Sequence, residues 1–271
     1  AQGSWQEAER LFSEAADGRR RALGDADAGT LASIDQLGAA LQAQRRFDEA
    51  EPRYREALDR RREALGPEHP DTLLSINNIG GLLQAQGRLD EAEPYLREAL
   101  AGNRLALGDD HRVTLNSISN MGILLSEQGR LAEAEPLLRE ALRKRRRALG
   151  DEHTETLYSV NNLGALLNLM GRFEEALATL EGSEGAARRG WTGDNARWLG
   201  NYLVKLGEAR AGMGDFAGAE ADLLEAYDLM AAGFGADHPK AIAGAAQLAA
   251  LYEAWSVAAP DSPSGQSPPV R

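Results

Sequence analysis

Histidines at a fixed interval are the residues of this sequence that first suggest chemistry. His69, His111 and His153 are separated by 42 residues each, and His238 follows later in the chain. Histidine is a common metal ligand, but side chains that recur once per structural repeat stand on successive layers of packed helices, about 8–10 Å apart or more. They cannot converge on one ion with bonds of about 2 Å. We therefore expect no metal site, and we expect these histidines to order the turns between repeats.

A catalytic site is not indicated by the remaining residue types. A Ser/His/Asp set needs its nucleophile on a sharp turn such as Gly-x-Ser-x-Gly, and the sequence contains none. The chain has no cysteine, which removes thiolate catalysis and cysteine-ligated zinc. Its carboxylates recur in register with a repeat, a pattern typical of solvated helix surfaces. The sequence predicts neither an enzyme nor a bound cofactor.

Basic clusters form the next group, at residues 19–21, 60–62 and 143–147. They fall where second helices are expected to end, and cations there favour the helix dipole and can pair with a glutamate one turn away. The alternative is a basic ridge for a phosphorylated or acidic partner. The best candidates for such a ridge are Arg143, Lys144, Arg145, Arg146 and Arg147.

Overall charge limits the classes of partner. The net charge is −12 and the isoelectric point is near 4.9. Nucleic acids and anionic membranes both attract positive proteins, so a general binder of either is not expected. No apolar run approaches 18 residues, so no segment is expected to span a membrane. The lack of cysteine fits a cytoplasmic location.

The elements that position these residues follow from an internal repeat. Residues 72–113 match the next 42 residues, 114–155, at 27 positions. One structural module has therefore been copied, and the chain is expected to be a stack of short units rather than a single central core.

Each copy of the repeat predicts a pair of antiparallel helices. Leu73, Ile76, Ile79 and Leu83 recur at intervals of three and four, the period of an amphipathic first helix. A glycine that can adopt a left-handed conformation follows this helix, at Gly87, Gly129 and Gly171. Arg45 takes the same place in the first copy, where that conformation would cost roughly 1 kcal/mol.

The second helices have their own start signals. An Asp-Glu-Ala-Glu sequence at 48–51 and again at 90–93 resembles a capping box. Pro52, Pro94 and Pro136 are expected at the edge of the first turn, where a missing N–H is tolerated.

The predicted helical region spans residues 4–255. It comprises a half repeat at 4–24, full repeats at 30–66, 72–108 and 114–150, a degenerate repeat at 156–190, a repeat at 195–235 and a terminal helix at 239–255. Glycines from Gly182 to Gly193 predict a short or bent second helix in the degenerate repeat, because each costs about 1 kcal/mol in a helix interior. Residues 256–271, rich in proline and serine, predict a disordered tail. The half repeat suggests a parent protein that continues upstream.

The repeat pattern resembles a known family. Gly-Arg-Leu-Asp-Glu-Ala at 87–92 and Leu-Arg-Glu-Ala-Leu at 96–100 are similar to the tetratricopeptide repeat (TPR), in the 42-residue form of kinesin light chains and many bacterial proteins. Asn-Asn-Ile-Gly at 77–80 and Asn-Asn-Leu-Gly at 161–164 are typical of that subclass. The resemblance implies an all-α, right-handed solenoid of antiparallel helix pairs. The part from Trp191 onward is similar to TPR tails of bacterial serine/threonine protein kinases, although no kinase motif is present.

The resemblance also implies a site, since family members bind peptides or partner helices in a concave groove lined by the first helices. Carried over to this sequence, the groove comprises Asp35, Gln42, Leu74, Asn77, Gln84, Asn116, Ser119, Ser126, Tyr158, Asn161 and Asn168. Asparagine and glutamine offer donors and acceptors that suit a peptide backbone. The alternative is that amides such as Asn78, Asn120 and Asn162 only tie neighbouring helices together. The mapped face holds no Lys or Arg, which favours a neutral or mildly basic ligand over an acidic one.

Three functions are compatible with these observations. The first is a non-catalytic scaffold that binds a protein or peptide in the groove. The second is a sensing or substrate-recruiting tail of a larger bacterial signalling enzyme such as a serine/threonine protein kinase. The third is a self-assembly module that forms a homo-oligomer through exposed ends of the solenoid.

Overall fold

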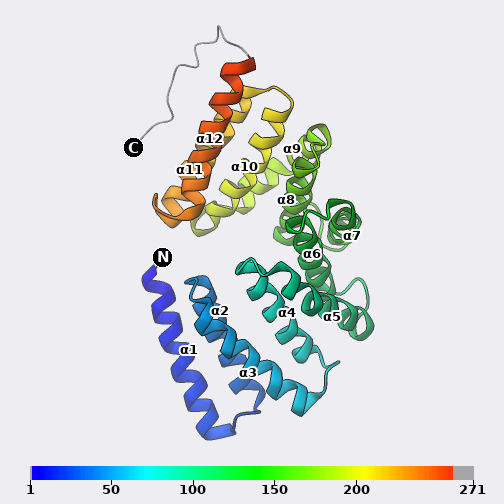
Figure 1. Ribbon diagram of the computed structural model, residues 1–271, viewed down its shortest axis with the longest axis vertical. Coiled ribbons are helices and arrows are strands. Elements are labelled where there is room, and N and C mark those ends of the chain that lie inside the picture. Colours follow the sequence, from blue (N-terminus) through cyan, green and yellow to red (C-terminus); the bar gives the residue numbers. More distant parts are fainter. Residues whose placement is uncertain (1, 259–271) are drawn as a thin grey trace. The chain divides into compact units, whose positions relative to one another are not determined.

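Helices form every regular element of the computed structural model, which describes residues 2–258 (Figure 1). First helices alternate with second helices along the chain. The first helices are α2 (Ala28–Ala43), α4 (Pro70–Ala85), α6 (Arg112–Glu127), α8 (Thr154–Leu169), α10 (Ala196–Gly212) and α12 (Pro239–Ala258). The second helices are α1 (Gln2–Leu23), α3 (Phe47–Leu65), α5 (Leu89–Leu107), α7 (Leu131–Leu149), α9 (Phe173–Gly190) and α11 (Phe216–Phe234), and a short 3₁₀ turn, η1 (Gly193–Asn195), precedes α10.

The chain divides into two compact units, residues 1–137 and residues 138–271. In the first unit each helix from α1 to α6 packs against the next one along the chain, and α4 also contacts α6. In the second unit α8 to α12 pack in the same sequential way, and α10 also contacts α8. The predicted fold class, an all-α stack of helix pairs, is confirmed. Among the described residues no helix is long and apolar enough to cross a membrane.

Close contact between paired helices depends on a glycine in the first helices α2, α4, α8 and α10. A Cβ atom added at Gly80 would lie 2.6 Å from Leu96 Cδ2, and one at Gly164 would lie 2.7 Å from Leu180 Cδ2. Leu96 and Leu180 are almost fully buried against these glycines. Burial of one such leucine stabilises the fold by about 1.5–3 kcal/mol. A side chain at the glycine position would displace the leucine, which explains why glycine recurs where the two helices of a pair cross.

The left-handed closures of the first helices are confirmed. Gly87 and Gly129 both have φ of 77°, and Gly171 has φ of 69°. Arg45 has φ of 60°, and it is the one residue other than glycine with positive φ in the described part of the chain. The repeat therefore imposes this conformation on whichever residue occupies the position.

Starts of the second helices differ from the prediction. The N-caps of α3, α5 and α9 are Arg46, Arg88 and Arg172, and none of these side chains caps the helix by a hydrogen bond. The expected capping box at residues 48–51 is therefore wrong, and Pro52 lies inside α3 rather than at its edge. The arginine at the N-cap instead pairs with the glutamate three residues on, as in Arg46 Nε to Glu49 Oε1 at 2.6 Å.

Two predictions about the C-terminal half are also wrong. Helix α9 is continuous from Phe173 to Gly190, because Ala176, Leu180 and Ala187 are fully buried and this packing offsets the glycines within it. Helix α12 continues to Ala258, so residues 256–258 do not belong to a tail. Residues 259–271 of the expected tail lie outside the described residues.

Candidate functional site on the first helices

The histidines cap first helices. His69 Nδ1 accepts a hydrogen bond from the backbone N–H of Asp71 at 3.2 Å, and His153 and His238 accept the same bond two residues on at 3.2 Å. His111 does so at 3.3 Å. These bonds satisfy a backbone donor at each helix start, and the prediction that the histidines order the inter-repeat turns is confirmed. Among the described residues no group of three His, Asp or Glu side chains is placed to hold a metal.

The candidate basic ridge does not form one surface. Arg145 is buried, with 4% of its surface exposed, and its guanidinium donates to Ser159 Oγ at 2.6 Å. Lys144 pairs with Glu140 at 2.9 Å, and Arg146 pairs with Asp151 at 2.8 Å. Only Arg143, Arg146 and Arg147 are exposed. The prediction that Arg145 belongs to an exposed basic ridge is wrong. Its side chain faces the next first helix, α8, and is buried there although it is charged.

Two of the mapped groove residues in the first unit are buried. Asp35 is 7% exposed and pairs with the buried guanidinium of Arg61 in α3. Burial raises the pKa of Asp35, and Arg61 opposes that shift. Ser119 is 5% exposed and donates to the Leu115 carbonyl at 3.0 Å. The expectation that these two side chains face a ligand is therefore wrong.

The other mapped residues of the first unit are accessible to different degrees. Leu74 and Asn116 are exposed, and Gln42, Asn77, Gln84 and Ser126 are half-buried. Asn77 Oδ1 accepts from Asn120 Nδ2 at 3.0 Å, which links α4 to α6. The alternative role of the second asparagine, a tie between helices, is confirmed at Asn120.

Other mapped amides and hydroxyls bond within the chain as well. Gln42 Oε1 accepts from Tyr54 Oη at 3.1 Å, and Gln84 Nε2 donates to Glu127 Oε2 at 2.9 Å. Ser126 Oγ donates to the Gly122 carbonyl at 2.9 Å. The face that remains accessible is centred on Leu74 and Asn116.

In the second unit, Tyr158 belongs to an aromatic cluster. Its ring lies 5.4 Å from that of the buried Trp191 and 5.3 Å from that of Trp198, edge to face in the second case. Asn161 is 8% exposed, and its Oδ1 accepts no hydrogen bond within the described part of the chain. Asn161 therefore does not present its amide to solvent as expected.

Two cations extend this cluster. The Arg197 guanidinium and the Lys240 ammonium each lie within 5.9 Å of the ring centres of Trp198 and Phe234, at 5.6 and 5.8 Å for Arg197 and at 5.6 and 5.5 Å for Lys240. Partial desolvation against the rings and the neighbouring Arg197 lower the pKa of Lys240. Arg197 in α10 and Lys240 in α12 lie beyond the mapped residues, which include no Lys or Arg.

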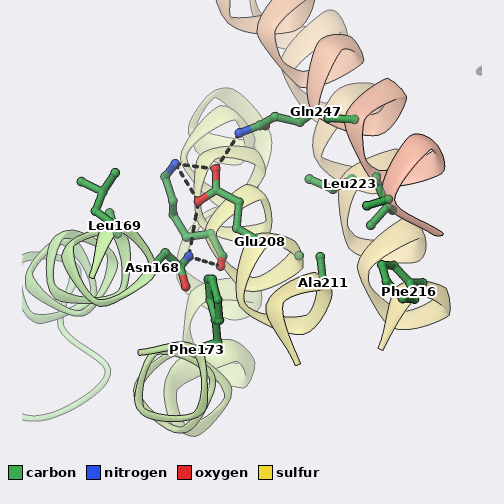
Figure 2. A pocket seen from close by; sticks show the side chains of 14 residues that line it. Asn168, Leu169, Phe173, Glu208, Ala211, Phe216, Leu223 and Gln247 are labelled. Carbon is green, nitrogen blue, oxygen red and sulfur yellow. Dashed lines mark hydrogen bonds and ion pairs between the residues drawn. The ribbon is translucent and has the colours of Figure 1, made fainter. Parts of the chain in front are cut away.

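The mapped residue Asn168 lines a cavity of about 470 Å³ in the second unit. The cavity lies among α8, α9, α10, α11 and α12 (Figure 2). Most of its lining is apolar, and Lys205, Glu208 and Gln247 provide the other polar groups. Asn168 Nδ2 donates to the Lys205 carbonyl at 2.8 Å and to Glu208 Oε2 at 3.3 Å.

Sequence reasoning missed Lys205, Glu208 and Gln247. The mapping of the groove stopped at the fourth copy, and the next copy is displaced by one residue in the repeat. The signal was nevertheless present, because Gly207 and Gly164 occupy matching positions where a second helix crosses. Continuing from Gly207 places Lys205 at the position of Asn162 and Glu208 at the position of Ala165.

Comparisons with known proteins agree with this architecture. A tetratricopeptide repeat profile matches residues 1–63, 30–104, 71–147 and 114–188, and a second tetratricopeptide repeat profile matches residues 199–240. A comparison with curated protein sequences gives no match.

Solved structures share the fold at low sequence identity. BtubC (BKLC) from P. vanneervenii is 23% identical with a TM-score of 0.69, and the match covers 87% of this chain and 94% of that one. A kinesin light chain from Podosopora anserina with nearly identical TPR-like repeats is 22% identical with a TM-score of 0.62, covering 75% of this chain and 96% of that one. PilF from Pseudomonas aeruginosa is 19% identical with a TM-score of 0.52, and the match covers 86% of this chain and 94% of that one. With glycine-crossed helix pairs, histidine-capped first helices and profile matches over residues 1–188 and 199–240, this chain belongs to the tetratricopeptide repeat family.

Proposed function

We propose that the chain is a non-catalytic scaffold that binds an extended peptide or a helix of a partner protein along the exposed face of its first helices. Repeats of this family serve in general as protein-interaction scaffolds. The face used in the first unit would take a neutral or mildly basic segment, because its mapped residues include no Lys or Arg.

A contrast in charge between the two kinds of helix carries the proposal. The second helices are covered by ion pairs between arginine and glutamate, such as Arg88 to Glu51 at 2.9 Å and Arg62 to Glu98 at 3.1 Å. Between their ends the accessible residues of α4 and α6 are uncharged, and the exposed charges of these helices, Asp71, Arg112 and Glu127, lie in their first or last turns. The core of a protein interface is depleted of charged residues, so the first helices offer the better docking surface.

Leu74 marks the centre of this surface in the first unit. It is 44% exposed near the start of α4, where a leucine gains nothing from contact with water. Asn77 and Gln84 lie one and three turns further along the same side of α4. An apolar contact flanked by amides suits a peptide that buries one side chain and bonds through its backbone.

The test uses a matched pair of substitutions. Peptides are selected from a phage-displayed library on the unmodified chain, and their affinities are measured for Leu74→Arg and for Leu105→Arg. Leu105 in α5 is 77% exposed on a second helix, so it controls for the added charge. We expect Leu74→Arg to weaken binding by about tenfold or more and Leu105→Arg to change it less than about twofold.

Equal weakening by both variants would exclude the proposed face, and selection of no peptide would exclude peptide binding at this face. Substitution of Asn77 and Asn161 is a poorer test. Asn77 accepts a hydrogen bond from Asn120, and Asn161 is buried. Substitution of either Asn77 or Asn161 would therefore also disturb helix packing.

A second candidate function is self-association through α1. Trp5 is 43% exposed and Leu11 is 49% exposed on this helix. Light scattering of the unmodified chain and of Leu11→Glu tests it. A monomer in both cases contradicts self-association, and an oligomer that dissociates in the variant supports it.

A further inference from the structure

Helices α1 and α12 are unlike halves of a repeat. Within residues 2–258, α1 is a second helix with no first helix before it, and α12 is a first helix with no second helix after it. Arg19 in α1 takes the position of Asn103 in α5, since both donate to the equivalent serine of the following first helix. His238 caps α12 as His69 caps α4. Each side chain of α1 and α12 can therefore be compared with its counterpart in a complete repeat.

On α12, the side that would meet a second helix is uncovered. Ile242 lies four residues after the capping His238 and is 56% exposed. The leucines at the same position of α2, α4, α6 and α8 are at most 3% exposed: Leu31, Leu73, Leu115 and Leu157. Leu73 packs against its own second helix, since a Cβ atom added at Gly102 in α5 would lie 2.4 Å from Leu73 Cδ2. Ile242 is exposed because the described part of the chain places no helix where α5 lies in that repeat.

On α1, the side that would meet a first helix is uncovered as well. Ala8 and Phe12 are half-buried. Their counterparts in α3, α5, α7 and α9 are at most 3% exposed: Ala50, Ala92, Ala134 and Ala176 for Ala8, and Tyr54, Leu96, Leu138 and Leu180 for Phe12. Gly18 takes the position of Gly102, and a Cβ atom added at Gly18 meets nothing within 4 Å. The space that a leucine fills beside Gly102 is therefore open beside Gly18.

The two uncovered sides match each other. Ile242 and Gly18 take the positions of Leu73 and Gly102, so α12 placed on α1 would repeat the contact between α4 and α5. The residues at these positions are uncharged on both helices, as in the core of a protein interface. One difference weakens the contact, because the glycine where α4 crosses α5 is replaced by Ala249 in α12, and its added carbon keeps the two helices further apart. A reversible association is therefore expected.

We propose that α12 of one chain docks on α1 of a second chain and completes a repeat across the junction, so that chains associate head to tail. The inference rests on the second candidate function, self-association through α1, and names the surface that α1 meets. Two different surfaces come together in this contact, so each assembly still has one free α1 and one free α12. Species larger than a dimer should therefore form as concentration rises.

Two substitutions block the two surfaces separately. Gly18→Glu adds a charge where α1 has open space, and Ile242→Glu adds one at an exposed position of α12, so both variants should fold. In sedimentation velocity each substitution should weaken association at least about tenfold. An equimolar mixture of the two variants should form a complex of one chain of each kind and nothing larger. Only α12 of the Gly18→Glu chain and α1 of the Ile242→Glu chain remain open in that mixture.

Gln6→Glu and Ala243→Glu are the controls. Each adds the same charge at an exposed position of α1 or α12 outside the two surfaces, and each should associate like the unmodified chain. An Ile242→Glu chain that still dimerises would show that α1 meets α1, which would overturn docking on α12 and leave self-association standing. A monomeric unmodified chain would overturn both, and controls as weak as the blocked variants would overturn the assigned surfaces.

A second measurement adds no charge to either surface. The chain has no cysteine, so Gly18→Cys and Ile242→Cys each introduce a single thiol. Their counterparts Gly102 and Leu73 are in contact, which places the two sulfurs within reach of a disulfide across the junction. Oxidation of an equimolar mixture should give mainly the mixed dimer. Dimers of Gly18→Cys alone, or no cross-link in a mixture of folded chains, would overturn the proposal.

Discussion

The guanidinium of Arg61 in α3 is buried against the carboxylate of Asp35 in α2, with 5% and 8% of the two side chains exposed. Arg61 also donates to Ser75 Oγ in α4, so one side chain joins three helices. The equivalent bond recurs along the chain, from Arg19 to Ser33 at 2.6 Å and from Asn103 to Ser117 at 2.9 Å. Asp35 therefore contributes to packing between repeats and not to the accessible face.

Removing one partner of this pair should be costly. Arg61→Asn should destabilise the chain by about 3–5 kcal/mol, because it leaves the Asp35 carboxylate buried without its cation. The double variant Asp35→Asn/Arg61→Asn should recover most of this loss, since the next repeat carries Asn77 and Asn103 at the same two positions. Urea unfolding measures both. A double variant as unstable as the single one would contradict the argument.

Glu93, which joins successive second helices, should contribute a pH-dependent amount to the free energy of unfolding. Glu93 accepts from Arg97 and, at 2.9 Å, from Arg130, and these bonds lower its pKa from 4.5 to about 2. The folded state therefore gains stability above pH 4.5 and loses it as pH falls toward 2. Glu93→Gln should cost about 1–2 kcal/mol at pH 7 and almost nothing at pH 2.

The control for this variant is Glu133→Gln, whose side chain is 60% exposed while it pairs with Arg130. Its effect in the same urea titrations should be small at both pH values. Equal effects of the two variants at pH 7 would show that bridging between repeats gives Glu93 no special role.

Asp222 should make the folded chain more stable as pH falls, whereas Glu93 makes it less stable. Burial raises its pKa from 3.8 to about 6 despite Arg210 at 2.7 Å, and nearby Glu184 adds to the rise. The folded state then binds a proton that the unfolded state releases, so this group adds stability as pH falls from 7 toward 4. Between pH 7 and pH 5 the gain should be about 1 kcal/mol in the unmodified chain relative to Asp222→Asn. Parallel pH profiles of unfolding free energy for the two proteins would refute this.

The strained closure of the first repeat can be relieved. Arg45 has φ of 60°, whereas the four equivalent closures, at Gly87, Gly129, Gly171 and Gly214, use glycine. Arg45→Gly should raise the free energy of unfolding by about 0.5–1 kcal/mol. Contact of Arg45 with Phe47, at 5.3 Å from the ring centre, opposes the gain. Thermal unfolding at fixed pH measures the difference, and a less stable variant would mean that this contact outweighs the strain.

Two helical glycines should respond oppositely to alanine. A Cβ atom at Gly182 in α9 meets nothing within 4 Å, so Gly182→Ala should stabilise the chain by about 0.5–1 kcal/mol. At Gly102 in α5 it would lie 2.4 Å from the buried Leu73, so Gly102→Ala should destabilise by about 1–3 kcal/mol. Calorimetric melting of both proteins decides the matter, and a shift of the same sign in each would contradict the packing described.

Local features of the fold could be predicted from the sequence because their causes lie within a few residues. Helical periodicity, the glycine that closes most first helices and the histidine before α4, α6, α8 and α12 all act within one or two turns. Arg45 shows how strong the pattern is, since the repeat position sets its backbone conformation against its own preference. Starts of the second helices were predicted less well, because their arginines bond to glutamates in the preceding repeat, as Arg88 does to Glu51.

The sequence by itself determined the all-α class, the repeat and its helix pairs, since these depend on periodicity and turn residues. Only the tertiary structure decided which polar residues are accessible, because Asp35, Ser119 and Asn161 are buried by helices distant in the sequence. The cavity near Asn168 likewise depends on α10 and α12, whose register relative to α8 no local pattern specifies. Burial and cavities result from contacts between separate helices, and such contacts are a property of the folded chain.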